Sequence, residues 1–260
     1  MSAVMALSNL LDARQVWRGR AEPIVEGEQP TGWPMLDAVL PARGWPEASL
    51  TEILMPVDGV GELRLVLPTL ARLTQGQRPV VLVAPPYLPC AMGWRQQGVN
   101  LHRLTIVDAE EKQVLWAAEQ CLRSGSCAAV LAWPHRADDR SLRRLQVAAD
   151  TGRALAFVFR DRKHLTNASP ASLRLELTTT PSTAIWVRKC RGGNAPSQPI
   201  PFDPVQRLSS ARGEGTWMCP VLRSEERRNS AVTTHAVHQR MRGSLDSGLC
   251  RNHERKKQSA

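Results

Sequence analysis

The feature that most constrains this chain is a regular alternation of short apolar runs with amphipathic segments. Five runs of continuous apolar character are typical of strands in a parallel sheet covered on both faces; they occupy residues 50–55, 79–84, 101–107, 128–133 and 154–159. Apolar residues recur at helical spacing in 62–74, 110–124 and 140–151. Strands that alternate with helices in this way imply right-handed crossovers, so the sequence predicts a layered α/β fold.

Two further strands are predicted at residues 172–179 and 183–190, without a helix between them. In the first, Leu173, Leu175 and Leu177 alternate with polar residues, so one face should contact water. An antiparallel hairpin at the edge of a mostly parallel central sheet fits both segments. Glycines that suit the left-handed residue closing a helix lie at positions 76, 98, 125 and 152, and the one at 98 implies a further short helix before it.

The first predicted strand leads into a glycine turn and then a helix, which is the arrangement of a phosphate-binding loop. Such a loop surrounds phosphates with backbone N–H groups, while a Lys reaches the terminal phosphates and a Ser or Thr hydroxyl binds magnesium. No Lys lies near Gly59 and Gly61. The stretch is therefore a nucleotide site, the remains of one, or an ordinary turn.

Residues 29–56, together with the alternating strands, resemble the core of the RecA recombinase family. They hold a Thr-Gly, a Leu-Asp, a glycine turn with Pro and a Glu-Ile strand in the family's order, at Thr31-Gly32, Leu36-Asp37, Gly44, Pro46 and Glu52-Ile53. The likeness continues more weakly to about Gly192. It implies a RecA-like core over 29–200, preceded by a short amino-terminal helix and linker over 1–28. The residues after a proline-rich boundary near 199–204 are rich in Ser, Arg, Gly and Asn, so we expect a basic, disordered tail over 201–260.

Within that superfamily the chain is similar to two smaller groups. One is ImuA, the RecA-like accessory protein of bacterial mutagenic translesion DNA synthesis, and the other is SulA, the SOS cell-division inhibitor. Residues 128–160 resemble both groups, including Trp133 at a strand end and Asp138-Asp139 before a helix. The segment 29–56 and the amino-terminal helix ending at residues 16–20 favour ImuA, which we rank first.

The ImuA resemblance implies an accessory protein that acts in the SOS response through protein contacts. Its partners would be a Y-family-like polymerase subunit and an error-prone C-family polymerase assembly, with RecA as a further candidate and DNA contact weak or indirect. The alternative is a SulA-like inhibitor that binds the tubulin-like division protein. A third hypothesis, a nucleotide-dependent recombinase regulator, requires a working ATPase site.

Alignment with the RecA family indicates that the phosphate loop is degenerate. Glu62 and Leu63 fall on the positions of the Lys and the Ser or Thr, and a carboxylate there would repel triphosphate. Residues 84–89 lack the family's catalytic glutamate, and Trp133-Pro134 replace its acidic strand end. The resemblance thus implies a pseudo-ATPase with no catalytic residue and no cofactor.

A weaker possibility is that the loop still holds an anion without catalysis. The residues concerned are Asp58, Gly59 and Gly61, next to the amino end of the predicted helix. The competing interpretation is a tight turn in which glycine permits close packing.

Two sets of residues are candidate contact sites. An apolar stripe at the amino terminus either packs on the chain's own core or docks on a partner, and its members are Leu7, Leu11 and Trp17. A basic segment after the strand at 154–159 either holds nucleic acid or is simply solvated, and its members are Arg160, Arg162 and Lys163.

Charge and cysteine content limit the remaining possibilities. The formal net charge is +10, and residues 205–260 hold 11 Lys or Arg against 5 Asp or Glu, a composition that suits a nucleic-acid contact or a solvated end. The six cysteines form no Cys-x-x-Cys pair, so we expect neither a disulfide framework nor a metal site. No apolar run reaches the roughly 20 residues that span a bilayer, and no secretory signal is recognisable, so we expect a cytoplasmic protein.

Overall fold

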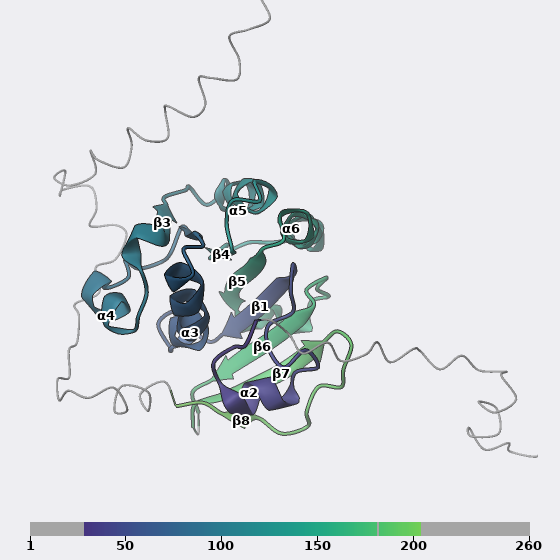
Figure 1. Cartoon of the computed structure of the whole chain (residues 1–260). Helices are drawn as coiled ribbons and strands as arrows, with labels where there is room; N and C mark the ends of the chain where they lie inside the picture. Colours follow the sequence, from purple (N-terminus) through teal and green to yellow (C-terminus); the bar gives the residue numbers. More distant parts are fainter. Residues whose placement is uncertain (1–28, 181, 204–260) are drawn as a thin grey trace, which may run out of the picture. The chain divides into compact units, whose positions relative to one another are not determined.

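The computed structural model describes residues 29–180 and 182–203. Within them lies a mixed α/β fold built on one mostly parallel sheet (Figure 1). The amino-terminal helix predicted within 1–28 and the tail predicted from 201 fall almost wholly outside the described residues. The proposed division into 1–28, 29–200 and 201–260 therefore stays a prediction.

The sheet has eight strands in the order β3-β2-β4-β5-β1-β6-β7-β8. The first six in this order are parallel, whereas β7 is antiparallel to both β6 and β8. The strands are β1 (Leu50–Met55), β2 (Val80–Val83), β3 (Leu104–Val107), β4 (Ala129–Ala132), β5 (Leu155–Asp161), β6 (Leu173–Thr178), β7 (Ala184–Cys190) and β8 (Ile200–Pro201). The seven strands predicted from the sequence are confirmed. The prediction that the β6–β7 hairpin closes the sheet is incomplete, since β8 pairs with β7.

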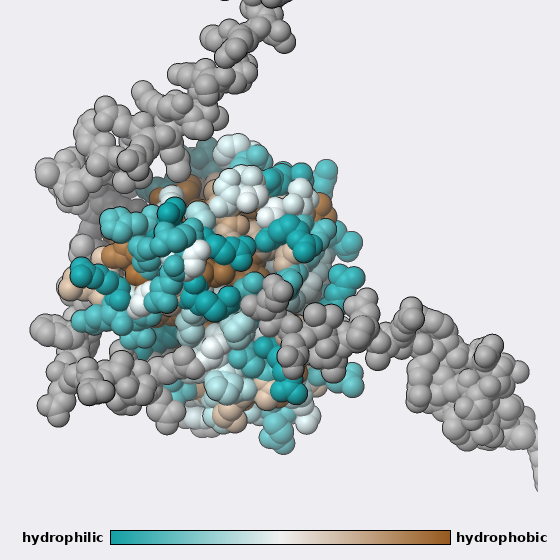
Figure 2. Space-filling view, in the orientation of Figure 1, coloured by the Kyte–Doolittle hydropathy of each residue, from teal (hydrophilic) through white to brown (hydrophobic). Residues whose placement is uncertain are grey.

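Helices cover both faces of the sheet, which explains the continuous apolar runs. On one face, α2 (Pro34–Val39), α3 (Glu62–Gln75) and α4 (Ala91–Gln96) contribute to an apolar cluster with Ile53 and Phe157. On the other, α5 (Val114–Arg123) and α6 (Asp139–Gly152) pack against Leu50 and Val130. All six residues of β1 are buried. Figure 2 shows that the visible surface is mostly hydrophilic, with hydrophobic residues showing between hydrophilic ones.

One expectation about the sheet is wrong: β6 has no face open to water. Its polar residues Arg174 and Glu176 are 7% and 1% exposed. Each is buried together with groups of opposite charge, Arg174 with Glu52 and Glu176 with Arg188. Alternation of polar and apolar residues normally marks a half-exposed strand, but here the polar positions form ion pairs under neighbouring segments.

The closing glycines are confirmed in part. Gly98 and Gly125 have the expected left-handed backbone, with φ of 85° and 64°. After α6 the left-handed residue is instead Arg153, with φ of 52°. Gly152 is required for a different reason, because a Cβ there would lie 1.8 Å from the carbonyl oxygen of Leu122 at the end of α5. This glycine lets the ends of the two helices approach closely.

Two shorter 3-10 segments, η1 (Leu101–Arg103) and η2 (Arg162–Thr166), precede β3 and follow β5. None of the described helices is long and apolar enough to cross a membrane.

Candidate functional site

The glycine loop connects β1 to α3 at the carboxyl edge of the sheet, where parallel sheets usually bind ligands. Gly59 and Gly61 have φ of 85° and 101°, values that side-chain-bearing residues rarely adopt. Gly61 lies directly before α3, so Glu62 is the first residue of that helix. The strand, glycine turn and helix predicted from the sequence are therefore present, and Glu62 begins the helix.

The carboxylate of Glu62 folds back into its own loop. The N–H of Gly59 donates a hydrogen bond to Oε1 at 3.0 Å, and Glu62 is only 2% exposed. Burial raises the pKa of Glu62, the backbone N–H groups of Glu62, Gly59 and Gly61 oppose that rise, and nearby Asp58 adds to it. The N–H of Gly59 is therefore directed at a carboxylate of the chain itself.

A small cleft opens beside this loop at the ends of β1, β2, β4 and β5. Its volume is about 160 Å³, below the roughly 300–1,000 Å³ of ordinary small-molecule sites. Trp133 and Phe159 contribute to its lining, with their rings stacked at 4.6 Å between centroids. Asp58 and Asp161 are its carboxylates. Burial raises the pKa of Asp58, His135 lowers it, and Asp161 raises it further.

At the two strand ends where the RecA resemblance implies acidic groups, other residues line the cleft. Ala84 and Pro86 line it after β2, and Trp133 and Pro134 line it after β4. Among residues 29–180 and 182–203, no group of three or more His, Cys, Asp or Glu side chains could hold a metal ion. The basic side chains that line the cleft are His135, Arg160 and Lys163.

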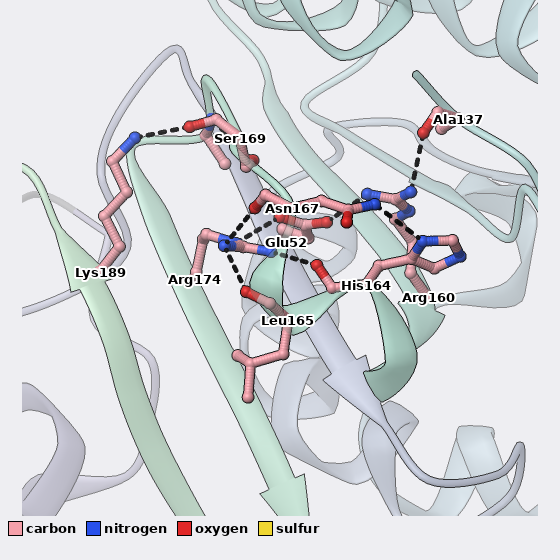
Figure 3. Close-up of polar contacts among 10 residues, drawn as sticks. Glu52, Ala137, Arg160, His164, Leu165, Asn167, Ser169, Arg174 and Lys189 are labelled. Atoms are coloured by element: carbon pink, nitrogen blue, oxygen red, sulfur yellow. Dashed lines mark hydrogen bonds and ion pairs between the residues drawn. The ribbon is translucent and has the colours of Figure 1, made fainter. Parts of the chain in front are cut away.

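The first basic candidate, Arg160, lies inside the protein. It is 3% exposed, and its Nη1 lies 2.6 Å from Oε1 of the fully buried Glu52 (Figure 3). Its Nη2 donates to the carbonyl of Ala137 at 2.8 Å. Arg160 also lines the cleft, where its guanidinium is paired with Glu52, and its role in nucleic-acid binding stays a prediction.

Glu52 also binds a second arginine, which sequence reasoning missed. Nε of Arg174 lies 2.6 Å from Oε2 of Glu52, and the rest of this guanidinium donates to the carbonyls of His164, Leu165 and Asn167 (Figure 3). One carboxylate thereby joins β1, β5, β6 and the η2 segment. The available signal was Glu52 itself, a charged residue within an otherwise apolar strand that needs a buried partner.

The other two basic candidates lie at the surface but have acidic neighbours. Arg162 is 3.5 Å from Glu176, and Lys163 is 3.1 Å from Asp161, with side chains 55% and 66% exposed. Their role in nucleic-acid binding stays a prediction. The partner-binding candidates Leu7, Leu11 and Trp17 lie outside the described residues and also stay predictions.

The fold is mixed α/β, and the loop between β1 and α3 holds the carboxylate of its own Glu62. A family model described as "Cell division inhibitor SulA" matches residues 50–156, from β1 to the beginning of β5. Among solved structures, the chain is similar to SulA from Pseudomonas aeruginosa, with 27% identity and a TM-score of 0.37; the match covers 44% of this chain and 98% of that one. A search among curated proteins found no match.

These findings correct the ranking made from the sequence. The family match names SulA, so the ImuA assignment is wrong, and with it the translesion-synthesis role and the polymerase partners. Two positions shared by both resemblances have structural roles: Trp133 stacks on Phe159, and Asp138 caps α6 by accepting a hydrogen bond from the N–H of Ser141. Such positions report the fold, and therefore they could not separate the two groups.

Proposed function

We propose that this protein inhibits cell division by binding the tubulin-like division protein in the cytoplasm and blocking its polymerisation. The observation that carries the proposal is the match of residues 50–156 to the cell-division-inhibitor family. That range contains the glycine loop, α3 to α6 and four complete strands. A family of inhibitors also agrees with an action through binding rather than through catalysis.

We further propose that the core is RecA-like and that its phosphate loop is no longer catalytic. Support for this comes from the strand, glycine turn and helix at β1 and α3, in which Glu62 accepts the N–H of Gly59. A buried carboxylate at this point would repel a triphosphate and compete with it for the same donors. The cleft beside the loop is also too small for a nucleotide.

A polymerisation assay tests the inhibitor proposal. The purified full-length chain should reduce the sedimented polymer of the division protein in a dose-dependent way, approaching complete inhibition near equimolar amounts. Because this chain carries a net charge of +10, an unrelated basic protein of similar charge is the control for non-specific association. Unchanged polymer at a several-fold excess of the chain would refute the proposal.

Expression in cells provides an independent test. Cells that produce the chain should grow as filaments even when their mutagenic polymerases have been deleted. Normal division at confirmed high expression would count against inhibition.

Titration with ATP tests the loop separately. We expect no heat of binding by calorimetry at submillimolar concentrations, with or without magnesium. A micromolar dissociation constant would show that the Glu62 carboxylate leaves the loop for a nucleotide, and that result would overturn the degenerate-loop proposal.

A further inference from the structure

An exposed tryptophan lies on the outer side of α5. Trp116 is 60% exposed, whereas its neighbours Ala117, Ala118 and Leu122 are buried against the sheet. Trp116 is the one aromatic residue among the exposed large apolar side chains of residues 29–180 and 182–203. Tryptophan is among the residue types most enriched at binding hot spots, so this exposed indole is a candidate contact with a partner.

The surface beside Trp116 is held rigid by a clamped carboxylate. Glu119, one turn further along α5, is 5% exposed. Nε of Arg123 lies 2.9 Å from its Oε1, and Nη2 of Arg144 from α6 contacts its Oε2. The two guanidinium groups stay about half exposed, at 45% and 55% of their side chains. They are thus fixed in place and still available to a partner.

The neighbouring helix continues this surface. Arg140, Arg144 and Val147 follow one another at spacings of four and three residues, which places them on one side of α6. Val147 is 55% exposed, and Arg140 is exposed as well. We call Trp116, Arg123, Arg140, Arg144 and Val147 the α5–α6 ridge. The ridge holds three arginines, two of which bind the buried Glu119, so it combines positive charge with the apolar side chains of Trp116 and Val147.

We propose that the α5–α6 ridge is the surface that binds the division protein, and that it meets an acidic face with an apolar recess for Trp116. This inference rests on the proposed function. Charge complementarity defines the partner, because three arginines around an indole favour carboxylates around an apolar pocket. Both helices lie wholly inside the family match. The helices lie side by side over one sheet face, as Figure 1 shows.

Protein fits the ridge better than single-stranded nucleic acid. Proteins that bind single strands stack successive bases on several aromatic side chains within a basic groove. The ridge offers one indole on the outer side of two helices. Its second apolar member, Val147, is aliphatic and cannot stack on a base in that way.

Two variants of the full-length chain test the assignment in the polymerisation assay and in direct titration of the division protein. Trp116→Ala should weaken binding about 30-fold, the effect of losing a hot-spot side chain. Arg140→Glu should slow association and reduce the dependence of affinity on salt. Met92→Ser is the matched control, because Met92 is 63% exposed on α4, which covers the other face of the sheet. An unchanged melting temperature shows that each variant is folded.

Each result decides the question. Loss of inhibition in both ridge variants, with Met92→Ser unchanged, supports the ridge. Full inhibition by the folded ridge variants refutes the ridge and leaves the proposed function standing. No inhibition by the wild-type chain refutes both. If the ridge variants lose affinity for a single-stranded oligonucleotide but still inhibit polymerisation normally, the ridge binds nucleic acid and the protein-docking proposal is wrong.

Discussion

At the scale of single residues, Glu52 has the largest structural effect that the described contacts indicate. It is fully buried and lies between two guanidinium groups, those of Arg160 and Arg174, each 2.6 Å away. A buried ion group of this kind contributes less than its short contacts suggest, because all three charges lose their hydration. Removing one of the three side chains lowers the stability strongly, however, because the remaining charges stay buried without a partner of opposite charge.

We therefore predict that Glu52→Gln lowers the free energy of unfolding by about 3–5 kcal/mol, as measured by urea titration. Asp139→Asn is the matched control, because Asp139 forms an exposed pair with Arg143, and it should cost below about 0.5 kcal/mol. A loss under about 1 kcal/mol for Glu52→Gln would mean that the two arginines find other partners.

Glu62 leads to a prediction about pH. Burial raises its pKa above the ordinary value of 4.5, so the folded chain holds this proton to higher pH than the unfolded chain does. The stabilisation that Glu62 contributes is complete below pH 4.5, and it is lost as the pH rises through the pKa that Glu62 has in the folded chain. Glu62→Gln removes this pH-dependent contribution to the free energy of unfolding, while its side-chain oxygen can still accept the N–H of Gly59.

The free energy of unfolding of the wild type should therefore rise relative to that of Glu62→Gln as the pH falls from neutral to about 4. Comparing the two proteins by urea unfolding at each pH cancels the contributions of other groups, including Asp138 and Asp161, whose lowered pKa values act in the opposite direction. A difference that stays constant with pH would show that Glu62 is not desolvated in its loop.

At the scale of elements, the contact between the ends of α5 and α6 depends on Gly152. A Cβ at this position would meet the carbonyl oxygen of Leu122 at 1.8 Å, and backbone cannot move aside easily. Gly152→Ala should therefore destabilise the protein by about 1–3 kcal/mol in thermal or urea unfolding.

Gly76→Ala is the control at the end of α3. Gly76 has φ of −71°, and an added Cβ there would lie 3.4 Å from its nearest neighbours. That change should be close to neutral. Equal destabilisation by both substitutions would mean that the helix ends, rather than the α5–α6 approach, determine the cost.

The sequence predicts the regular elements well because their apolar periodicity is strong. All seven expected strands and three expected helices are present. No bounds were predicted for the helices α2 and α4 or the strand β8, since six or two residues are too few for a period to show. For the site, the glycine loop was predictable, whereas the pairing of Arg160 with Glu52 joins residues 108 positions apart and leaves no local pattern.

At the scale of the whole molecule, the strand order joins the family-matched range to the residues after it. The match ends at residue 156, two residues into β5, yet β1 pairs with both β5 and β6, and Arg160 and Arg174 come after that limit. The middle of the sheet is therefore incomplete without the chain's later strands.

A chain that ends after Asp161 should accordingly fail to unfold cooperatively in urea, because β6 and the second partner of Glu52 are missing. A chain that ends after Asp203 keeps every described strand and should retain a sigmoidal transition. A cooperative transition in the shorter chain would show that β1 tolerates an open edge.

The carboxylate held inside the glycine loop has a consequence for control in the cell. A side chain tethered three residues from the N–H that it accepts competes with any free phosphate compound at a high effective concentration. The proposed inhibitor would then not respond to the nucleotide level of the cell and would be active as soon as it folds. The degree of inhibition would depend on the number of copies synthesised.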